Sequence, residues 1–246
     1  MQDLVYRGII IKQADYGDAH RMLWIFTETD GIIKAVRYGV RGKKTSNAAA
    51  FQMFSYGDFK LRQSRGDIMT ATSADVIDGF YPVSEDIKKL SLLSYLAEIT
   101  YSLLGEANPD RRILALLLNA VYAAAYRDEN LIKLKSVYEL KLMSIGGYLP
   151  KLDVCGECGN EGEYFSIDRG TLVCREHHRA GDVKVNAPLS ALMRYVAYCN
   201  DKKMLSFSAA DNDILMAFNS ITEKYVSVHC DKEFKSLSYF YAICEA

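Results

Sequence analysis

The first third of the chain alternates apolar and polar residues with a period of two, which predicts β-strands. β-Branched and aromatic side chains are frequent in five segments, residues 4–11, 21–27, 32–36, 53–61 and 68–77. Asp30-Gly31 is typical of a two-residue hairpin turn. Another turn is expected at residues 64–67, and a polar stretch at residues 38–50 interrupts the pattern. Five short strands with one irregular connection predict a small closed barrel of the OB type, although an SH3-like barrel has the same strand count. Trp24 is expected in its core.

After residue 81 the apolar residues recur at helical spacing, which predicts a helical region. Helices are expected over residues 87–104, over a segment that begins at Pro109 and includes residues 113–121, over residues 131–145 and over residues 234–243. Further helices are expected to begin at Pro188 and after the cap Ser208. The helix that begins at Pro109 is apolar nearly all round, so we expect it to be the central, buried helix. Asn108 is expected to cap it, with Pro109 in its first position.

The composition is that of a globular chain. Half of the 246 residues are apolar and a quarter are charged, which excludes a disordered, collagen-like or coiled-coil protein. We find no run of about 18 uncharged apolar residues and no pattern of a signal peptide at the start. The sequence therefore predicts a soluble, cytoplasmic protein, and its cysteine usage fits a reducing compartment.

Four residues with metal-ligand spacing carry the strongest chemical signal. Cys155 and Cys158 are separated by two residues, and Cys174 and His177 follow with the same spacing after fifteen more. Two such knuckles supply the four soft ligands of a structural zinc site. His178 could replace His177 as the fourth ligand, but only His177 keeps the two-residue spacing. We therefore expect one structural Zn²⁺ per chain, which would also stabilise a segment poor in apolar residues.

These patterns together predict an α+β fold. A five-stranded OB-type barrel would occupy residues 1–80, and an all-α domain would occupy residues 81–152 and 183–246. A small zinc-binding module at residues 153–182 would be inserted in the helical domain. A catalytic zinc would need an open coordination position and a general base, and no nucleophile, deaminase or phosphate-binding motif occurs in the sequence. The sequence therefore predicts no enzyme.

A basic stretch lies in the barrel region. Between residues 34 and 65, eight basic residues face one acid, a net charge of +7. The basic residues are Lys34, Arg37, Arg41, Lys43, Lys44, Lys60, Arg62 and Arg65. Aromatic residues lie among them, at Tyr38, Phe54, Tyr56 and Phe59. Cations for phosphates and rings for base stacking are typical of a single-strand binding channel, whereas a solvated loop and core aromatics are the alternative explanation.

The order of barrel, helices, zinc module and further helices resembles the bacterial recombination mediator family RecO. The residues that carry the resemblance are Gly8-Ile9-Ile10 with Tyr16-Gly17-Asp18, Phe26-Thr27 before Asp30-Gly31, Val40-Arg41-Gly42-Lys43-Lys44, and Gly147-Tyr148-Leu149-Pro150 before Cys155-x2-Cys158-Gly159. Four cysteines are common at the metal site of this family, and here His177 stands at the fourth position.

The resemblance implies a non-enzymatic DNA-binding protein of DNA repair, associated with the nucleoid. Such a protein binds single- and double-stranded DNA, anneals complementary strands, and helps RecR to load RecA on DNA coated by single-strand-binding protein. An RNA-binding OB protein with structural zinc and a zinc-dependent hydrolase are the alternatives. Competition between DNA and RNA would separate the first alternative.

Overall fold

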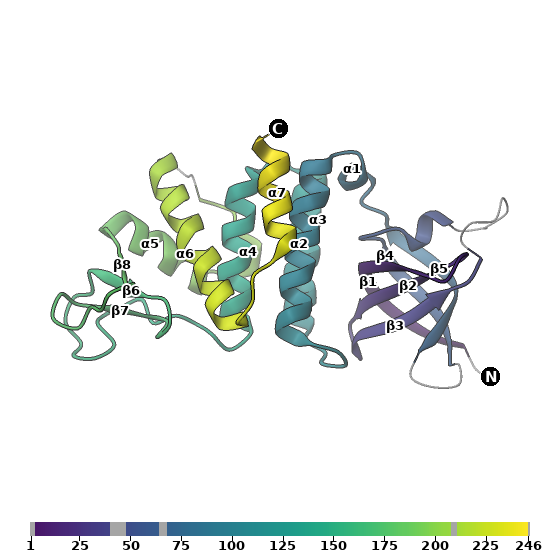
Figure 1. The fold of residues 1–246 in the computed structure, drawn as a ribbon, viewed down its shortest axis with the longest axis horizontal. Helices are drawn as coiled ribbons and strands as arrows, with labels where there is room; N and C mark the ends of the chain where they lie inside the picture. Colours follow the sequence, from purple (N-terminus) through teal and green to yellow (C-terminus); the bar gives the residue numbers. More distant parts are fainter. Residues whose placement is uncertain (1–2, 40–47, 64–67, 208–210, 246) are drawn as a thin grey trace. The chain divides into compact units, whose positions relative to one another are not determined.

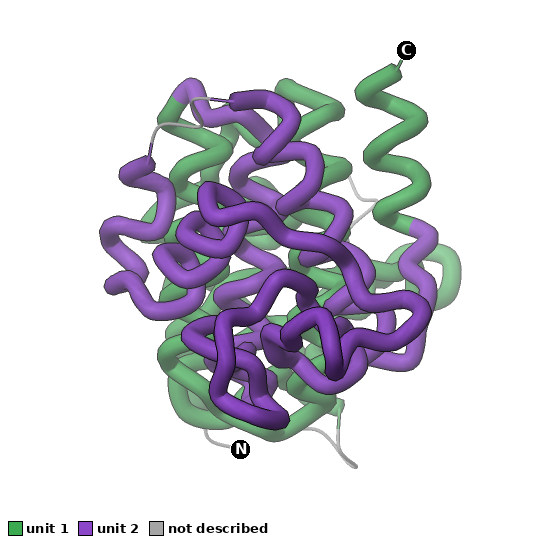
Figure 2. The backbone as a smooth tube through the Cα atoms, turned by 90° about the vertical axis from the view of Figure 1, so that its left-hand side faces the viewer, with its two compact units in different colours: residues 1–127, 236–246 green, residues 128–235 purple. Residues whose placement is uncertain are grey.

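The computed structural model describes residues 3–39, 48–63, 68–207 and 211–245 (Figure 1). The chain forms two compact units, coloured separately in Figure 2. One comprises residues 1–127 with 236–246, and the other comprises residues 128–235. The predicted domains place all helices in one helical domain, whereas the two compact units divide them. The predicted domain boundaries stay a prediction.

The first unit contains a closed five-stranded barrel with the strand order β1-β2-β3-β5-β4. The strands are β1 (Asp3–Tyr16), β2 (His20–Thr27), β3 (Gly31–Arg37), β4 (Tyr56–Gln63) and β5 (Met69–Asp78). Neighbouring strands are antiparallel, except that β3 and β5 run parallel at Ala35↔Met69 and Val36↔Thr70. The predicted OB-type barrel is therefore confirmed.

The interior of the barrel is filled by alternate residues of each strand. From β2 it receives Leu23 and Ile25, which are fully buried in one cluster with Phe59 and Leu61 of β4. Trp24 lies between the two β2 residues, so its side chain points to the opposite face of the strand. There it is half-buried beneath the Lys12 ammonium group, 4.6 Å from the ring centroid. The expectation that Trp24 is a barrel-core residue was therefore wrong.

The hairpin between β2 and β3 differs from the predicted two-residue turn. Thr27 pairs with Gly31, so residues 28–30 form the turn and Gly31 already belongs to β3. Gly31 has φ = 70°, and an added Cβ would lie 2.4 Å from the Asn108 backbone nitrogen. The glycine is thus required by a close approach of backbone. After β3, a short 3₁₀ helix, η1 (Ala48–Phe51), precedes β4. The predicted turn at residues 64–67 lies outside the described residues.

Within its described residues, the first unit contains the α-helices α1 (Tyr81–Ser84), α2 (Ile87–Leu104), α3 (Arg111–Tyr126) and α7 (Lys235–Glu245, which enters this unit at Ser236). Asp110, not Asn108, caps α3, because its carboxylate accepts hydrogen bonds from the backbone amides of Arg112 and Ile113. Helix α3 is also not buried all round, since Asn119 and Tyr122 are exposed. Alanine and tyrosine count as apolar residues in the sequence pattern of α3, but both residue types also occur at solvent-exposed positions.

The second unit contains α4 (Leu131–Ile145), α5 (Ala187–Tyr198), the 3₁₀ helix η2 (Asp201–Lys203) and α6 (Asn212–Cys230). Its small sheet consists of β6 (Tyr164–Ser166), β7 (Thr171–Val173) and β8 (Val183–Lys184) in the order β7-β6-β8. Helix α4 is the buried one, with residues 134–143 all inside. Pro188 lies in the first turn of α5 as predicted. Asp211 caps α6, and Ser208 is outside the described residues.

No helix in the described ranges is both long enough and apolar enough to cross a bilayer.

Candidate metal centre and nucleic-acid interface

The four predicted metal ligands come from two tight turns of the second unit. In the first turn the Cys155 amide donates to Asn160 O (2.7 Å) and the Gly159 amide donates to Cys155 O (2.9 Å). Gly159 has φ = 77°, which lets the chain reverse directly after Cys158. The second turn follows β7, and there the His177 amide donates to Cys174 O (3.1 Å). The backbone hydrogen bonds of these two turns thus direct both pairs of side chains to one point.

The donor atoms of Cys155, Cys158, Cys174 and His177 all lie within 4.8 Å of one another. The Sγ atoms of Cys158 and Cys174 are 3.7 Å apart. His177 Nδ1 is 3.2 Å from Cys174 Sγ and 3.9 Å from Cys155 Sγ. A tetrahedral ion with Zn–S bonds of about 2.3 Å and Zn–N bonds of about 2.0 Å would separate its ligands by about 3.6–3.8 Å. The cluster therefore has the size and the donor set to hold a metal ion.

The two neighbouring histidines have different surroundings. His177 faces the cysteines, whereas His178 Nδ1 lies 3.0 Å from the carbonyl oxygen of Arg175. The His178 ring also stacks on Tyr164, with ring centroids 4.4 Å apart and an interplanar angle of 19°. The structure thus brings His177 to the three cysteines and holds His178 outside the cluster.

The environment of the cluster favours the thiolate, the form of cysteine that binds metals, at Cys155 and Cys174. At Cys155 burial opposes ionisation, but hydrogen bonds from the backbone of Cys174, Glu157 and Cys158 outweigh it and lower the pKa of the thiol to about 6. At Cys174 the hydrogen bond with His177 lowers the thiol pKa, and the same bond raises the pKa of His177. At Cys158 a backbone hydrogen bond from Asn160 lowers the pKa of the thiol, but burial and hydrogen bonds with Cys155 and Cys174 outweigh it and raise the pKa. An ion would therefore compete with protons at two thiols that lose them readily and at one that holds its proton.

Arg169 braces this module, and the sequence analysis did not single it out. Its guanidinium group lies 3.0 Å from Glu157 Oε1 and 2.9 Å from Asp182 Oδ2, and its Nε donates to Ser166 Oγ (2.8 Å). Glu157 lies between Cys155 and Cys158, so Arg169 connects the first turn to β6 and to the segment before β8. No local sequence signal marks this arginine, because its partners Glu157 and Asp182 lie 12 and 13 residues away.

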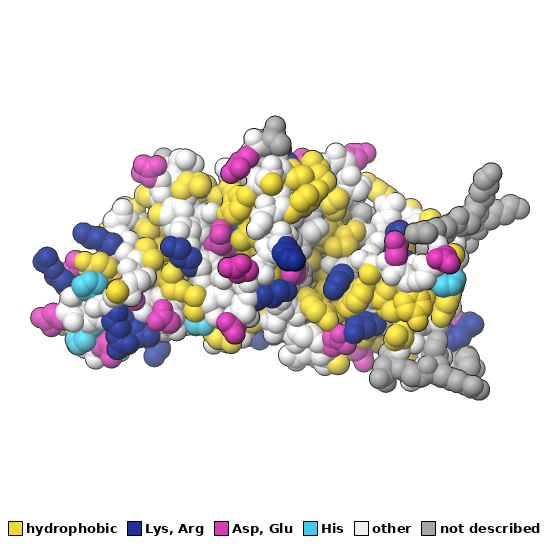
Figure 3. Space-filling model, viewed as in Figure 1, with side chains coloured by type: hydrophobic (Ala, Val, Ile, Leu, Met, Phe, Trp, Pro, Cys, Tyr) yellow, Lys and Arg dark blue, Asp and Glu magenta, His cyan; other side chains and the backbone are white. Residues whose placement is uncertain are grey.

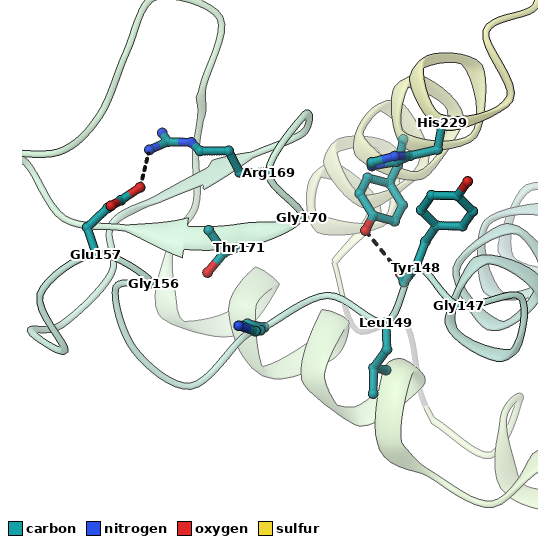
Figure 4. A pocket seen from close by; sticks show the side chains of 11 residues that line it. Gly147, Tyr148, Leu149, Gly156, Glu157, Arg169, Gly170, Thr171 and His229 are labelled. Atoms are coloured by element: carbon teal, nitrogen blue, oxygen red, sulfur yellow. Dashed lines mark hydrogen bonds and ion pairs between the residues drawn. The ribbon is translucent and has the colours of Figure 1, made fainter.

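A pocket of about 380 Å³ opens beside the metal cluster in the second unit (Figure 4). Tyr225 forms one wall, and its hydroxyl donates to Tyr148 O (3.0 Å). Gly170 faces that hydroxyl, and an added Cβ there would lie 2.6 Å from it. The four cluster residues are not among the residues that line this pocket. Gly156 and Glu157, which lie between Cys155 and Cys158, are the lining residues that adjoin the cluster in the sequence.

Every described member of the predicted DNA-binding set has a partner. Lys34 Nζ lies 2.5 Å from Glu106, Lys60 Nζ lies 3.3 Å from Asp75, and Arg62 Nε lies 2.8 Å from Asp3. Arg37 donates to the carbonyl oxygens of Ala71 and Thr72 and covers the Phe51 ring. The other four, Arg41, Lys43, Lys44 and Arg65, lie outside the described residues.

The pairing extends to a cation that sequence analysis did not include. Arg7 forms two hydrogen bonds of 2.8 Å with Asp58 of β4. Consistent with such pairing, basic and acidic side chains are interspersed on the face shown in Figure 3. On the described surface of the barrel, carboxylates from other segments therefore offset part of the positive charge of residues 34–65.

The four predicted aromatic residues separate clearly by burial. Phe54 and Phe59 are fully buried, and Tyr56 is half-buried. Only Tyr38 is well exposed, with 50% of its surface accessible. The alternative of core aromatics therefore holds for Phe54 and Phe59 and fails for Tyr38.

Two family models match the chain. "Recombination protein O N terminal" matches residues 1–80, and "Recombination protein O C terminal" matches residues 84–238. "DNA repair protein RecO" of Acetivibrio thermocellus is 27% identical over 97% of this chain and 96% of its own length. The protein of the same name from Alkaliphilus metalliredigens is 30% identical, over 94% and 95%. That of Rubrobacter xylanophilus is 32% identical over 69% of each chain.

Proposed function

Because this chain belongs to the RecO family of DNA repair proteins, we propose that it is a non-enzymatic recombination mediator that binds single- and double-stranded DNA and anneals complementary strands. The observation that carries the proposal is the match of both family models, which cover the barrel and most of the helical part in succession. The closed OB-type barrel supports it, because this fold commonly binds oligonucleotides. Action on DNA would place the protein on the nucleoid.

The proposal includes the partners that the family resemblance implies. In that role the protein would help RecR to load RecA on DNA coated by single-strand-binding protein. Annealing needs no group that makes or breaks covalent bonds, since base pairing supplies the free energy. The protein would contribute only a surface that concentrates and aligns the strands.

We propose that the cluster of Cys155, Cys158, Cys174 and His177 holds one structural Zn²⁺. Four protein donors complete a tetrahedral shell and leave no position for a substrate or an activated water. Glu157, an acid near the cluster, is held by Arg169 at 3.0 Å, which argues against its use as a general base. When bound, the ion would link the two cysteine turns and stabilise a segment with a small apolar core.

We propose that the barrel supplies most of the affinity for DNA through its predicted basic residues, with Arg41, Lys43 and Lys44 as the main phosphate contacts. Lys34, Lys60 and Arg62 would exchange their present carboxylates for phosphates. Arg37 would act mainly by holding β5, because its guanidinium group is engaged by carbonyl oxygens of that strand. Neutralising roughly four to six phosphates of a single strand gives a slope of log K against log salt of about −3 to −4.

The test is annealing of complementary strands without ATP, together with titration of a single strand at several salt concentrations. The triple variant Arg41→Glu/Lys43→Glu/Lys44→Glu should bind all sequences more weakly and flatten the salt slope. The matched control Lys202→Glu/Lys203→Glu/Lys224→Glu makes the same charge change on exposed residues of the second unit. Equal affinity and slope in the two variants would contradict the proposed interface, and stronger binding of RNA than of DNA would favour an RNA-binding protein.

A further inference from the structure

Tyr38 is the exposed ring that lies nearest in the sequence to the predicted phosphate-binding residues Arg41, Lys43 and Lys44. It directly follows β3, whose last residue is Arg37, and half of its surface is accessible. The other aromatic residues of the basic region are buried or half-buried. An exposed ring among cations is the arrangement with which proteins hold single strands, because every base offers a face for stacking.

The orientation of this ring is fixed by the start of β2. His20 packs against Tyr38 edge to face, with ring centroids 4.7 Å apart and an interplanar angle of 69°. The Gly39 amide donates a hydrogen bond to His20 Nδ1 (3.2 Å), which fixes the backbone on the other side of Tyr38. Gly39 has φ = 72°, a conformation that favours glycine. His20 thus occupies one side of the ring, while half of the residue's surface remains accessible.

Basic residues follow the ring in the sequence, since Arg41, Lys43 and Lys44 lie within six residues of it. Arg37 and its β2 partner Arg21 alternate with Tyr38 and His20, so their side chains point to the other face of the strands. An apolar partner would gain little from one ring in this setting, whereas a nucleic acid satisfies both the charges and the ring. We propose that Tyr38 is a stacking platform for one unpaired nucleobase, and that His20 is its positioning residue. This inference rests on the proposed function and names a residue for recognition of single strands.

Stacking requires a base that is not already stacked in a duplex. Tyr38 should therefore contribute to binding of single strands and contribute nothing to binding of double-stranded DNA. It should also contribute equally for all four bases within a few-fold, since a π-face carries little sequence information.

The experiment compares an oligodeoxythymidine with a strand of the same length in which abasic sites replace every base. Both strands carry the same phosphates. Tyr38→Ala should bind the thymidine strand about five- to a hundredfold more weakly than the wild type, and the abasic strand equally well. Tyr38→Phe keeps the ring and should stay within about twofold on both strands. Tyr239→Ala removes another exposed ring, on α7, and should change neither affinity.

His20→Ala should weaken binding of the thymidine strand by a smaller factor and leave the abasic strand unaffected, since His20 acts through Tyr38. A strand with one 5-iododeoxyuridine should crosslink to Tyr38 under long-wavelength ultraviolet light. If the wild type binds neither strand, the proposed function fails. If the wild type binds both with the expected salt dependence and Tyr38→Ala does the same, the stacking platform alone is wrong. Thermal unfolding checks that each variant is folded.

Discussion

Lys135 Nζ lies 2.9 Å from Glu139 Oε1 inside α4, and neither side chain is exposed to solvent. The ammonium group also lies 3.0 Å from Asn219 Oδ1 and 3.2 Å from Glu223 Oε2, both on α6. Thr222 of the same helix donates to Glu139 Oε2 (2.7 Å). Burial of a charge is tolerated only with such partners. The two helices are therefore held in one register by a polar network within their interface.

Removing one side of this network should destabilise the second unit. Lys135→Met leaves Glu139 and Asn219 without their shared donor, so we expect unfolding free energy to fall by about 3–5 kcal/mol. Lys202→Met, at an exposed position of η2, should change it by less than about 0.5 kcal/mol. Urea denaturation followed by circular dichroism measures both. A cost for Lys135→Met as small as that of the control would show that the network is unimportant for stability.

Metal content should depend on four residues. Cys158→Ser and His177→Ala should lose the ion and expose residues 150–182 to hydrogen exchange, because they remove donor atoms of the cluster. His178→Ala should keep the ion, since its ring nitrogen faces a carbonyl group. Cys199→Ser, in the same unit but outside the cluster, should keep it as well. Elemental analysis of protein purified under reducing conditions decides, and absence of metal from the wild type would falsify the zinc proposal.

The acids paired with the barrel's cations should limit its affinity for DNA. Asp3→Asn and Asp75→Asn release Arg62 and Lys60 from their ion pairs. Each released cation that then contacts a phosphate should steepen the salt slope for a single strand by about 0.7. Asp128→Asn, in the other unit, provides the control for the change in net charge alone. Slopes identical to that of the wild type would place the phosphate path away from β4 and β5.

The cap of α3 should give a pH-dependent contribution to stability. The hydrogen bond from Arg112 is the main reason that the pKa of Asp110 lies below its ordinary value, and backbone amides add to it against the effect of burial. A lowered pKa in the folded state means stabilisation that is complete above about pH 4 and lost as the pH falls through the folded-state pKa.

Asp110→Ala should therefore cost about 1 kcal/mol at pH 7 and progressively less below pH 4. Asp110→Asn retains a good cap without a titrating group, so its stability should change less with pH than that of the wild type. Urea denaturation at pH 7, 4 and 3 gives the comparison. A cost of Asp110→Ala that grows toward low pH would have the wrong sign for this explanation.

The sequence patterns predicted the features that depend on residues close together in the chain. The strands of the barrel follow from alternation, and the metal cluster follows from two short turns whose ligands are close in sequence. The start of α3 was missed by two residues because Asn108 and Asp110 are both good caps. Only the structure shows that the Asp110 side chain accepts the hydrogen bonds from the first backbone amides of the helix.

Contacts between residues far apart in the sequence could not be predicted. The period of α4 alone could not show that Lys135 and Glu139 are buried, since their partners Asn219 and Thr222 lie more than 80 residues later. Likewise, the sequence could not show that Arg62, a predicted DNA-binding residue, pairs with Asp3, which is 59 residues away on β1. A charge count over a segment cannot include acids that the fold brings to it from elsewhere.

Helix α7 gives the protein a constraint during synthesis. Residues 236–246 belong to the first unit, where Phe240 is fully buried and Ser236 Oγ donates to Glu98 Oε2 of α2. Domains ordinarily fold as they leave the ribosome, the N-terminal one first. Here the unit that begins emerging first cannot acquire α7 until the second unit, residues 128–235, has emerged. The nascent chain must therefore wait with part of α2 uncovered while the whole second unit is made.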